Sequence, residues 1–166
     1  MGAWIAAIFA YESPQRVDKL VITGNPGLHG SPNRRMLSWQ LPDEATVASW
    51  VSKVARIDGV DAVRVTEEKV EKMQTEGYAD AFSKIMTHMG TDENRQRYAM
   101  ERRLPYLEAE TLYLWGKTDP AAEQAEVWHK LTPNSTLQVV DAGHRLHVDE
   151  PELFANCVRD FLLAKA

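Results

Sequence analysis

Residues 111–119 read TLYLWGKTD. The first five contain no charge and no alternation of polar and apolar side chains, which is typical of a strand buried in a parallel sheet. Gly116 ends the run and Asp119 follows it. Because α/β proteins place functional groups beyond the carboxyl ends of parallel strands, Asp119 is a candidate acid. Asp119 also precedes a helical pattern at residues 121–131, so a helix-capping role is the alternative.

Two other segments have the same character and complete the predicted sheet. They are LVIT at residues 20–23 and TLQVV at residues 136–140. A helical pattern around 123–131 separates the second and third strands, and apolar spacing at 151–163 predicts a last helix. We therefore predict an α/β fold with about three parallel strands, flanking helices and right-handed crossovers.

His144 follows the third predicted strand as Asp119 follows the second. Parallel strands with one helix between them would bring both residues to the same edge of the sheet. An imidazole there can act as a general base near neutral pH. A surface-loop histidine is the alternative, and His147 is a weaker candidate for the base. The remaining histidines, His29, His88 and His129, show no ligand spacing, so no metal site is predicted.

The middle of the chain carries helical patterns and no strand pattern. We predict a helical cap at residues 42–103, inserted into a core made of residues 1–41 and 104–166. Asp43 and Thr66 are predicted to cap helices within it.

Four residues are candidate lining positions of a pocket. Gly24 and Asn25 belong to the loop after the first strand, and Trp50 and Phe82 are aromatic residues of the predicted cap. Each has an ordinary alternative, because a tight turn needs glycine and a helical cap needs aromatic side chains for its own packing.

The composition argues against nucleic acid and membranes as partners. The 166 residues carry a net charge of −5, and their basic side chains are scattered rather than clustered. No apolar run reaches the length of about 18 residues that a membrane span needs. The single cysteine, Cys157, permits no internal disulfide, and it fits a reducing, cytoplasmic setting as a buried thiol. No cofactor is implied.

Four motifs extend the argument from single residues to most of the chain. They are MGA at 1–3, SPQRVDKLV at 13–21, WGKTD at 115–119, and GH at 143–144 followed by VDEPELF at 148–154. They resemble, in order, the residues after a nucleophile-elbow serine, the approach to strand six, the acid turn, and the histidine loop with the last helix. The chain therefore resembles the C-terminal half of an α/β-hydrolase-fold enzyme.

Two shorter motifs resemble one branch of that family. PGL at 26–28 and VTEEKV at 65–70 are similar to meta-cleavage-product hydrolases, which cleave carbon–carbon bonds in vinylogous diketo acids. Many of those enzymes have a tryptophan after the catalytic histidine, where Arg145 stands here, and an esterase-like relative fits almost equally. The resemblance implies a small apolar ester or a diketo-acid-like compound as substrate.

The resemblance implies a retained pair, Asp119 and His144, without its serine. The family's nucleophile would lie one residue before Met1, whose backbone nitrogen takes the position of an oxyanion donor. Strands one to five of the family fold fall outside this sequence. No elbow context surrounds Ser31, Ser38, Ser49, Ser52 or Ser83, so none of these serines is a credible substitute. We therefore expect a hydrolase that is weak or inactive by itself.

Two other functions stay open at this point. One is a self-associating, non-catalytic binding protein, and the other is an enzyme whose serine comes from another chain or whose His144 activates water directly. Residues 3–11 are apolar nearly all round, which predicts a buried helix, and the strand at 20–23 lacks its family neighbour. Because unpaired strand edges pair with other chains, we predict a homodimer or larger assembly through these two segments.

Overall fold

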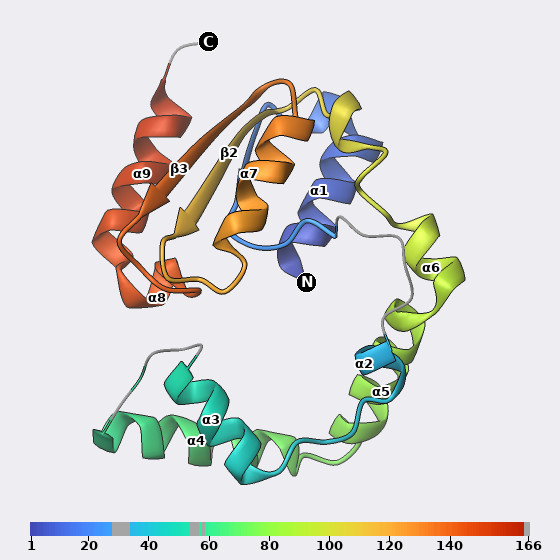
Figure 1. The fold of residues 1–166 in the computed structure, drawn as a ribbon, viewed down its shortest axis with the longest axis vertical. Coiled ribbons are helices and arrows are strands. Elements are labelled where there is room, and N and C mark those ends of the chain that lie inside the picture. The colour runs from blue at the N-terminus through green and yellow to red at the C-terminus, as the bar shows by residue number, and fades with distance from the viewer. Residues whose placement is uncertain (28–33, 54–56, 58, 165–166) are drawn as a thin grey trace. The chain divides into compact units, whose positions relative to one another are not determined.

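The protein is described here by a computed structural model. The residues it describes are 1–27, 34–53, 57 and 59–164. The chain divides into two compact units, Met1–Gly30 with Tyr98–Ala166, and Ser31–Arg97 (Figure 1). The second unit overlaps the predicted cap at 42–103. His29 and Ser31, which carried sequence-based predictions, lie outside the described residues.

The first unit contains the sheet and the helices that cover it. Its helices are α1 (Gly2–Glu12), α7 (Ala122–Leu131), α8 (Leu146–Asp149) and α9 (Pro151–Leu163), with short 3-10 turns at Pro14–Arg16 and Leu104–Tyr106. Its strands are β1 (Lys19–Ile22), β2 (Glu110–Gly116) and β3 (Ser135–Val140). The fold class is α/β, as predicted, with three parallel strands in one sheet.

The sheet has the order β1-β2-β3, so β2 is the central strand. Leu20 of β1 aligns with Thr111, and Gly116 aligns with Val140 of β3. Only β2 is buried along its length from Thr111 on. The prediction that all three strands are fully buried was wrong for β1, where half-buried and buried residues alternate, and for β3, which has no buried residue. Among the described residues, each of these two strands has a neighbouring strand on one side only.

The side chains of β2 point alternately to two layers of helices. Tyr113 and Trp115 face α7, where the Trp115 and Trp128 rings lie 5.1 Å apart and the Tyr113 hydroxyl hydrogen-bonds Thr132 Oγ1 at 2.8 Å. Leu112 and Leu114 face the other layer, in a cluster that includes Cys157 of α9. Cys157 is a buried free thiol. The two-sided burial explains why the strand reads as a continuous apolar run.

The first helix, α1, is buried on one face only. Trp4, Ala7 and Ala10 are buried, whereas Ile5 and Phe9 are exposed. The helix ends where the Ser13 N–H donates to Phe9 O and Pro14 begins a 3-10 turn. The prediction of a helix buried all round was therefore wrong for the face that carries Ile5.

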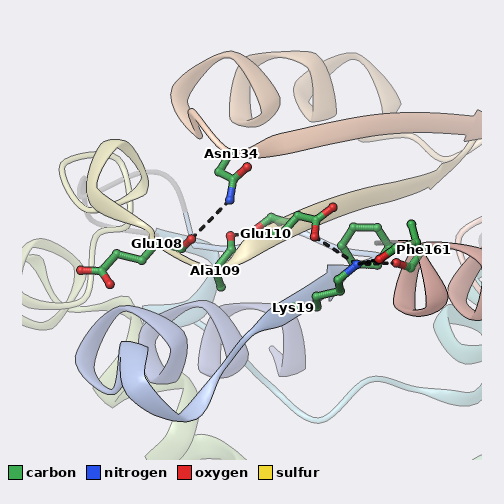
Figure 2. A network of polar contacts seen from close by, with 8 residues as sticks. Lys19, Glu108, Ala109, Glu110, Asn134 and Phe161 are labelled. Atoms are coloured by element: carbon green, nitrogen blue, oxygen red, sulfur yellow. Dashed lines mark hydrogen bonds and ion pairs between the residues drawn. The ribbon is translucent and has the colours of Figure 1, made fainter. Parts of the chain in front are cut away.

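Lys19 links β1 to the C-terminal end of α9 (Figure 2). Its ammonium group donates to the carbonyl oxygens of Phe161 and Ala164 at 2.9 and 2.8 Å, at the end of α9. The same group forms an ion pair with Glu110 Oε2 at 3.1 Å and lies 5.0 Å from the Phe161 ring centre. One cation thus satisfies carbonyl groups that a helix end leaves without partners.

All the regular elements that the structure describes in the second unit are helices, joined by turns and irregular segments. Its helices are α2 (Arg34–Leu37), α3 (Glu44–Lys53), α4 (Gly59–Met73), α5 (Tyr78–Gly90) and α6 (Asp92–Arg97) (Figure 1). The α3 and α4 helices pack together through Val47, Val51 and Thr66, which are buried. The α2 and α5 helices pack closely enough that a side chain at Gly90 would come 2.9 Å from Met36 Cβ.

One of the two predicted helix caps in this unit is confirmed. Asp43 Oδ1 accepts the Thr46 N–H at 2.8 Å at the start of α3, and hydrogen bonding from Thr46 lowers the pKa of the Asp43 carboxyl. Thr66 is not a cap, because α4 begins at Gly59 and the Thr66 hydroxyl donates to Ala62 O within the helix. The prediction for Thr66 was wrong because a threonine hydroxyl can also donate to a backbone carbonyl within a helix.

Candidate functional site

The turn after β2 is tied to the turn after β3 by backbone hydrogen bonds. The Lys117 N–H donates to Val140 O at 2.8 Å, and the Thr118 N–H donates to Ala142 O at 3.1 Å. The Thr118 hydroxyl donates to the same Ala142 oxygen at 3.0 Å. The two turns that carry the candidate acid and base are therefore held together before either side chain is considered.

Gly116 makes this close approach of the two turns possible. A Cβ atom at position 116 would lie 2.2 Å from Gly143 O and 2.5 Å from Ala142 O. Both atoms belong to the backbone, so no rotation of a side chain could relieve the overlap. Only glycine fits at the end of β2 while the histidine turn keeps its position.

Asp119 and His144 meet at this edge of the sheet. Asp119 Oδ2 lies 2.7 Å from His144 Nδ1. The Asp119 side chain is 3% exposed and that of His144 is 43% exposed. Because an ionised carboxylate only accepts hydrogen bonds, a neutral His144 paired in this way carries its proton on Nδ1 and leaves Nε2 as the basic nitrogen.

The second carboxylate oxygen of Asp119 has a structural role. Asp119 Oδ1 accepts the Ala121 N–H at 2.8 Å, directly before α7 begins at Ala122. This bond closes a turn before the helix, whose N-cap is Ala121, so the helix-capping alternative for Asp119 was wrong. The backbone bond fixes the carboxylate plane and directs Oδ2 at the imidazole.

His147, the weaker candidate for the base, does not share this arrangement. It lies in α8, is exposed, and contacts the edge of Phe154 at a ring distance of 6.1 Å. Arg145 and Asp149 hold the start of the same helix through a 3.4 Å ion pair. The described part of the chain joins His144, and not His147, to a carboxylate.

The Gly24–Gly27 loop packs tightly against α1. Gly27 has a φ of +76°, and a Cβ there would lie 2.1 Å from Trp4 Nε1. Asn25 Oδ1 accepts the Gly27 N–H at 2.7 Å, and a Cβ at Gly24 would touch Ala3 Cβ at 3.6 Å. These contacts support the turn interpretation, and a pocket-lining role for Gly24 and Asn25 stays a prediction.

The other candidate positions lie in separate surroundings. Met1 precedes α1, where its carbonyl oxygen accepts the Ile5 N–H at 3.1 Å. Trp50 lines a cavity within the helical unit. Phe82 stacks on Trp39 and Tyr78, with ring centres 5.6 and 5.0 Å away. No group of three or more His, Cys, Asp or Glu residues among the described ones could hold a metal ion.

Comparison with known proteins decides the family. A family model described as "alpha/beta hydrolase fold" matches residues 1–151. The chain belongs to the alpha/beta hydrolase family.

Two curated relatives of this alpha/beta hydrolase chain cover nearly its whole length. A Bacillus subtilis protein named as a 2-succinyl-6-hydroxy-2,4-cyclohexadiene-1-carboxylate synthase is 28% identical over 98% of the chain. A Pseudomonas putida protein named 2-hydroxy-6-oxononadienedioate/2-hydroxy-6-oxononatrienedioate hydrolase 2 is 30% identical over 98% of it. The chain spans 63% and 60% of these two relatives.

Solved structures of the hydrolase fold agree with the architecture. A serine hydrolase from Cycloclasticus zankles superimposes on 98% of the chain with a TM-score of 0.78 and 17% identity, and the match covers 61% of that protein. A meta-cleavage product hydrolase from Pseudomonas fluorescens superimposes on 96% of the chain with a TM-score of 0.70 and 16% identity, again over 61% of the neighbour. At these identities the likeness concerns the fold. Among the described residues, no helix of this hydrolase-fold chain is long and apolar enough to cross a membrane.

A serine–histidine contact in the hydrolase core was not predicted from the sequence. His129 Nδ1 lies 2.8 Å from Ser135 Oγ, at the start of β3. The Ser135 hydroxyl also lies 2.7 Å from Thr132 O and 3.2 Å from His129 O, so it closes the turn between α7 and β3. The sequence feature that could have indicated this contact is the turn-forming segment Thr132-Pro133-Asn134. This serine begins β3, whereas Asp119 and His144 follow the carboxyl ends of their strands.

Proposed function

We propose that this chain carries the acid–base pair of a hydrolase, with Asp119 orienting His144 and His144 Nε2 accepting the proton of the attacking oxygen. The observation that supports it is the 2.7 Å contact between a buried carboxylate and a half-exposed imidazole. In such a pair the carboxylate fixes the tautomer and stabilises the imidazolium that forms when the base takes up a proton. The exposed ring of His144 leaves its second nitrogen accessible to a substrate or a water molecule.

The proposed substrate class is suggested by the relatives. One relative is named as a hydrolase of 2-hydroxy-6-oxononadienedioate, an unsaturated keto acid, and one structural neighbour is titled a meta-cleavage product hydrolase. We extend this class to the present chain, with small apolar esters as the alternative acyl donors. Neither class needs a cofactor.

We also propose that the 166-residue chain is a weak catalyst by itself. The unit that holds His144 contains two serines, Ser13 and Ser135. Ser13 lies at the end of α1, and Ser135 is bound within the turn before β3. Neither stands on a sharp turn between a strand and a helix, which is the setting of an activated serine in this family. Weak hydrolysis would then depend on water activated by His144.

The test is hydrolysis of p-nitrophenyl acetate by the purified chain, alongside fluorophosphonate labelling read by intact mass. We expect slow hydrolysis above the buffer rate, and no stoichiometric adduct. His144→Ala and Asp119→Asn should each lower the corrected rate by at least about tenfold, because general base catalysis contributes that much or more.

The matched control is His147→Ala, which removes an exposed imidazole three residues further on. It should hydrolyse the ester at the parent's rate. A His144→Ala variant as fast as the parent would refute the acid–base role. A stoichiometric adduct would instead show that a serine is activated, and peptide mapping would identify it.

A further inference from the structure

The helical unit contains a cavity of about 340 Å³. Its apolar wall comes from Val47 and Trp50 of α3, Met73 at the end of α4 and Tyr78 at the start of α5. Every residue that lines it belongs to this one unit. The volume falls in the range of about 300–1,000 Å³ that is typical of sites for small molecules.

One aromatic side of the wall, Tyr78, is held in place by a stack of rings. The Tyr78 ring stacks on Phe82 at 5.0 Å with an angle of 18° between the planes, and Phe82 stacks on Trp39 at 5.6 Å. Val47 is buried against α4. The stack fixes the Tyr78 side of the wall before a ligand arrives, which reduces the entropy lost on binding.

Two lysine side chains complete the lining on the α4 side. Lys69 and Lys72 lie three residues apart, so they share one side of the helix. The Lys69 ammonium lies 4.6 Å from the centre of the Trp50 ring, so a cation is placed directly beside the aromatic wall.

These two ammonium groups differ from other cations of the same unit. Arg64 pairs with Glu68 at 2.6 Å, and Lys84 pairs with Asp80 at 2.6 Å. Neither Lys69 nor Lys72 forms an ion pair with any residue that the structure describes. Among the described residues that line the cavity, Lys69 and Lys72 are the only charged ones, and both are cations.

We propose that this cavity binds a small monocarboxylate with an apolar body. The ring or short chain of the ligand would contact Trp50, Met73 and Tyr78, and its carboxylate would bind the Lys69 and Lys72 ammonium groups. Apolar contact supplies affinity, and the two cations select the acid over neutral compounds of the same shape. This binding is separate from the hydrolytic function proposed above, and it needs no reaction at His144.

The test is isothermal titration calorimetry with the intact chain. The probes are 4-phenylbutyrate and octanoate, which share a carboxylate but differ in the apolar body, and the neutral 4-phenylbutyramide. We expect saturable binding of at least one acid and binding of the amide at least about tenfold weaker, because the amide lacks the charge-assisted bonds. The better of the two acids identifies the apolar body that the cavity prefers.

A double variant, Lys69→Met with Lys72→Met, should weaken acid binding by at least about tenfold while leaving the amide unchanged. The control is Lys84→Met with Lys130→Met, which changes the net charge equally but removes lysines of two surface pairs with Asp80 and Glu126. The control should bind the acid as the parent does. Circular dichroism would confirm that both variants keep their helices.

Three outcomes would overturn the proposal. They are no saturable binding of either acid, equal binding of acid and amide, and equal losses in the two double variants. None of these outcomes bears on ester hydrolysis, because the probes contain no bond that the proposed hydrolase would cleave. Failure of this inference and failure of the hydrolytic proposal are therefore distinguishable.

Discussion

At the scale of single residues, the position of one glycine matters as much as the Asp119–His144 pair that it supports. Asp119 and His144 form the proposed acid–base pair, but Gly116 allows the turn after β2 to lie against the turn after β3. The hydrogen bonds of Thr118 to Ala142 then fix the approach. The geometry of the pair thus depends on a residue that has no side chain.

We predict that Gly116→Ala disrupts the pair. A methyl group 2.2 Å from Gly143 O forces the backbone of the histidine turn to move, and overpacking of this kind destabilises by about 1–3 kcal/mol. The melting temperature should fall, and the proton shared by His144 Nδ1 and Asp119 should vanish from its downfield position in the proton NMR spectrum. Gly2→Ala is the control, since nothing lies within 4 Å of a Cβ there. An unchanged NMR signal in Gly116→Ala would contradict the prediction.

The sequence predicted Asp119 and His144 but not the backbone contacts that position them. Asp119 and His144 could be found because each follows a recognisable strand, and strand ends meet at one edge of a parallel sheet. The contact of Gly116 with Gly143 O depends on backbone positions more than 25 residues apart, which no local pattern encodes. The Ser135–His129 contact was missed for a related reason, since it depends on how one turn closes.

At the scale of elements, hydrophobic patterns predicted which segments form strands better than how deeply they are buried. The central strand, β2, is buried as its run of apolar residues indicated. The residues of β3 are similar, yet Val139 is exposed, and β3 is an edge strand of the sheet formed by the described residues. Gln138, whose side chain binds Cys157 Sγ at 3.2 Å, was the visible departure from a continuous apolar run. The burial of a strand depends on the elements that pack beside it, and the strand's own residues do not show which elements those are.

We predict that Lys19→Met weakens the attachment of α9 to the sheet. Methionine keeps the apolar stem but removes the donor to Phe161 O and Ala164 O and the partner of Glu110. We expect the free energy of unfolding to fall by about 1–2 kcal/mol, the order expected for hydrogen bonds from a charged donor after allowance for partial exposure. Amide hydrogen exchange in the last turn of α9 should accelerate. Chemical denaturation and exchange measured by mass spectrometry would check both effects.

Lys130→Met provides the comparison for that experiment. Lys130 pairs with Glu126 on the surface of α7, with both side chains more than 60% exposed. Exposed pairs of this kind contribute little, so its removal should leave the stability unchanged. Equal effects of the two substitutions would show that the Lys19 contacts at the end of α9 are not stabilising.

At the scale of the whole molecule, one face of α1 remains apolar and exposed. Met1, Ile5 and Phe9 recur at every fourth position, which places them on one side of the helix, and they are 57%, 61% and 40% exposed. The neighbouring strand β1 is paired on one side only. Aligned apolar side chains beside an unpaired strand edge are typical of surfaces that associate.

We predict that the 166-residue chain forms a homodimer or larger assembly through α1 and β1. Light scattering coupled to size exclusion should give a mass above 18.8 kDa at micromolar concentration. Ile5→Lys should shift it to the monomer, because a lysine at the contact leaves a desolvated charge. Val63→Lys, at an equally exposed valine of α4, should not. A monomeric parent would refute the prediction.

The family was predictable because its motifs are spread along the chain. The acid turn and the histidine loop resembled α/β hydrolases in order and spacing, and the match of residues 1–151 to the family confirms the resemblance. The cavity beside Lys69 and Lys72 was not predicted, because its lining comes from three helices whose packing is a tertiary property. A single aromatic residue such as Trp50 could indicate either a pocket or ordinary packing between helices.

The hydrogen bonds around Gly27 have a consequence for how such a chain can diversify. The Met100 N–H donates to Gly27 O at 3.0 Å, and the Trp4 indole donates to Tyr98 O at 2.7 Å. The polypeptide therefore leaves the sheet-bearing unit and re-enters it at one anchored point. We predict that the segment between these anchored ends can be lengthened, shortened or exchanged without stretching the strands on either side.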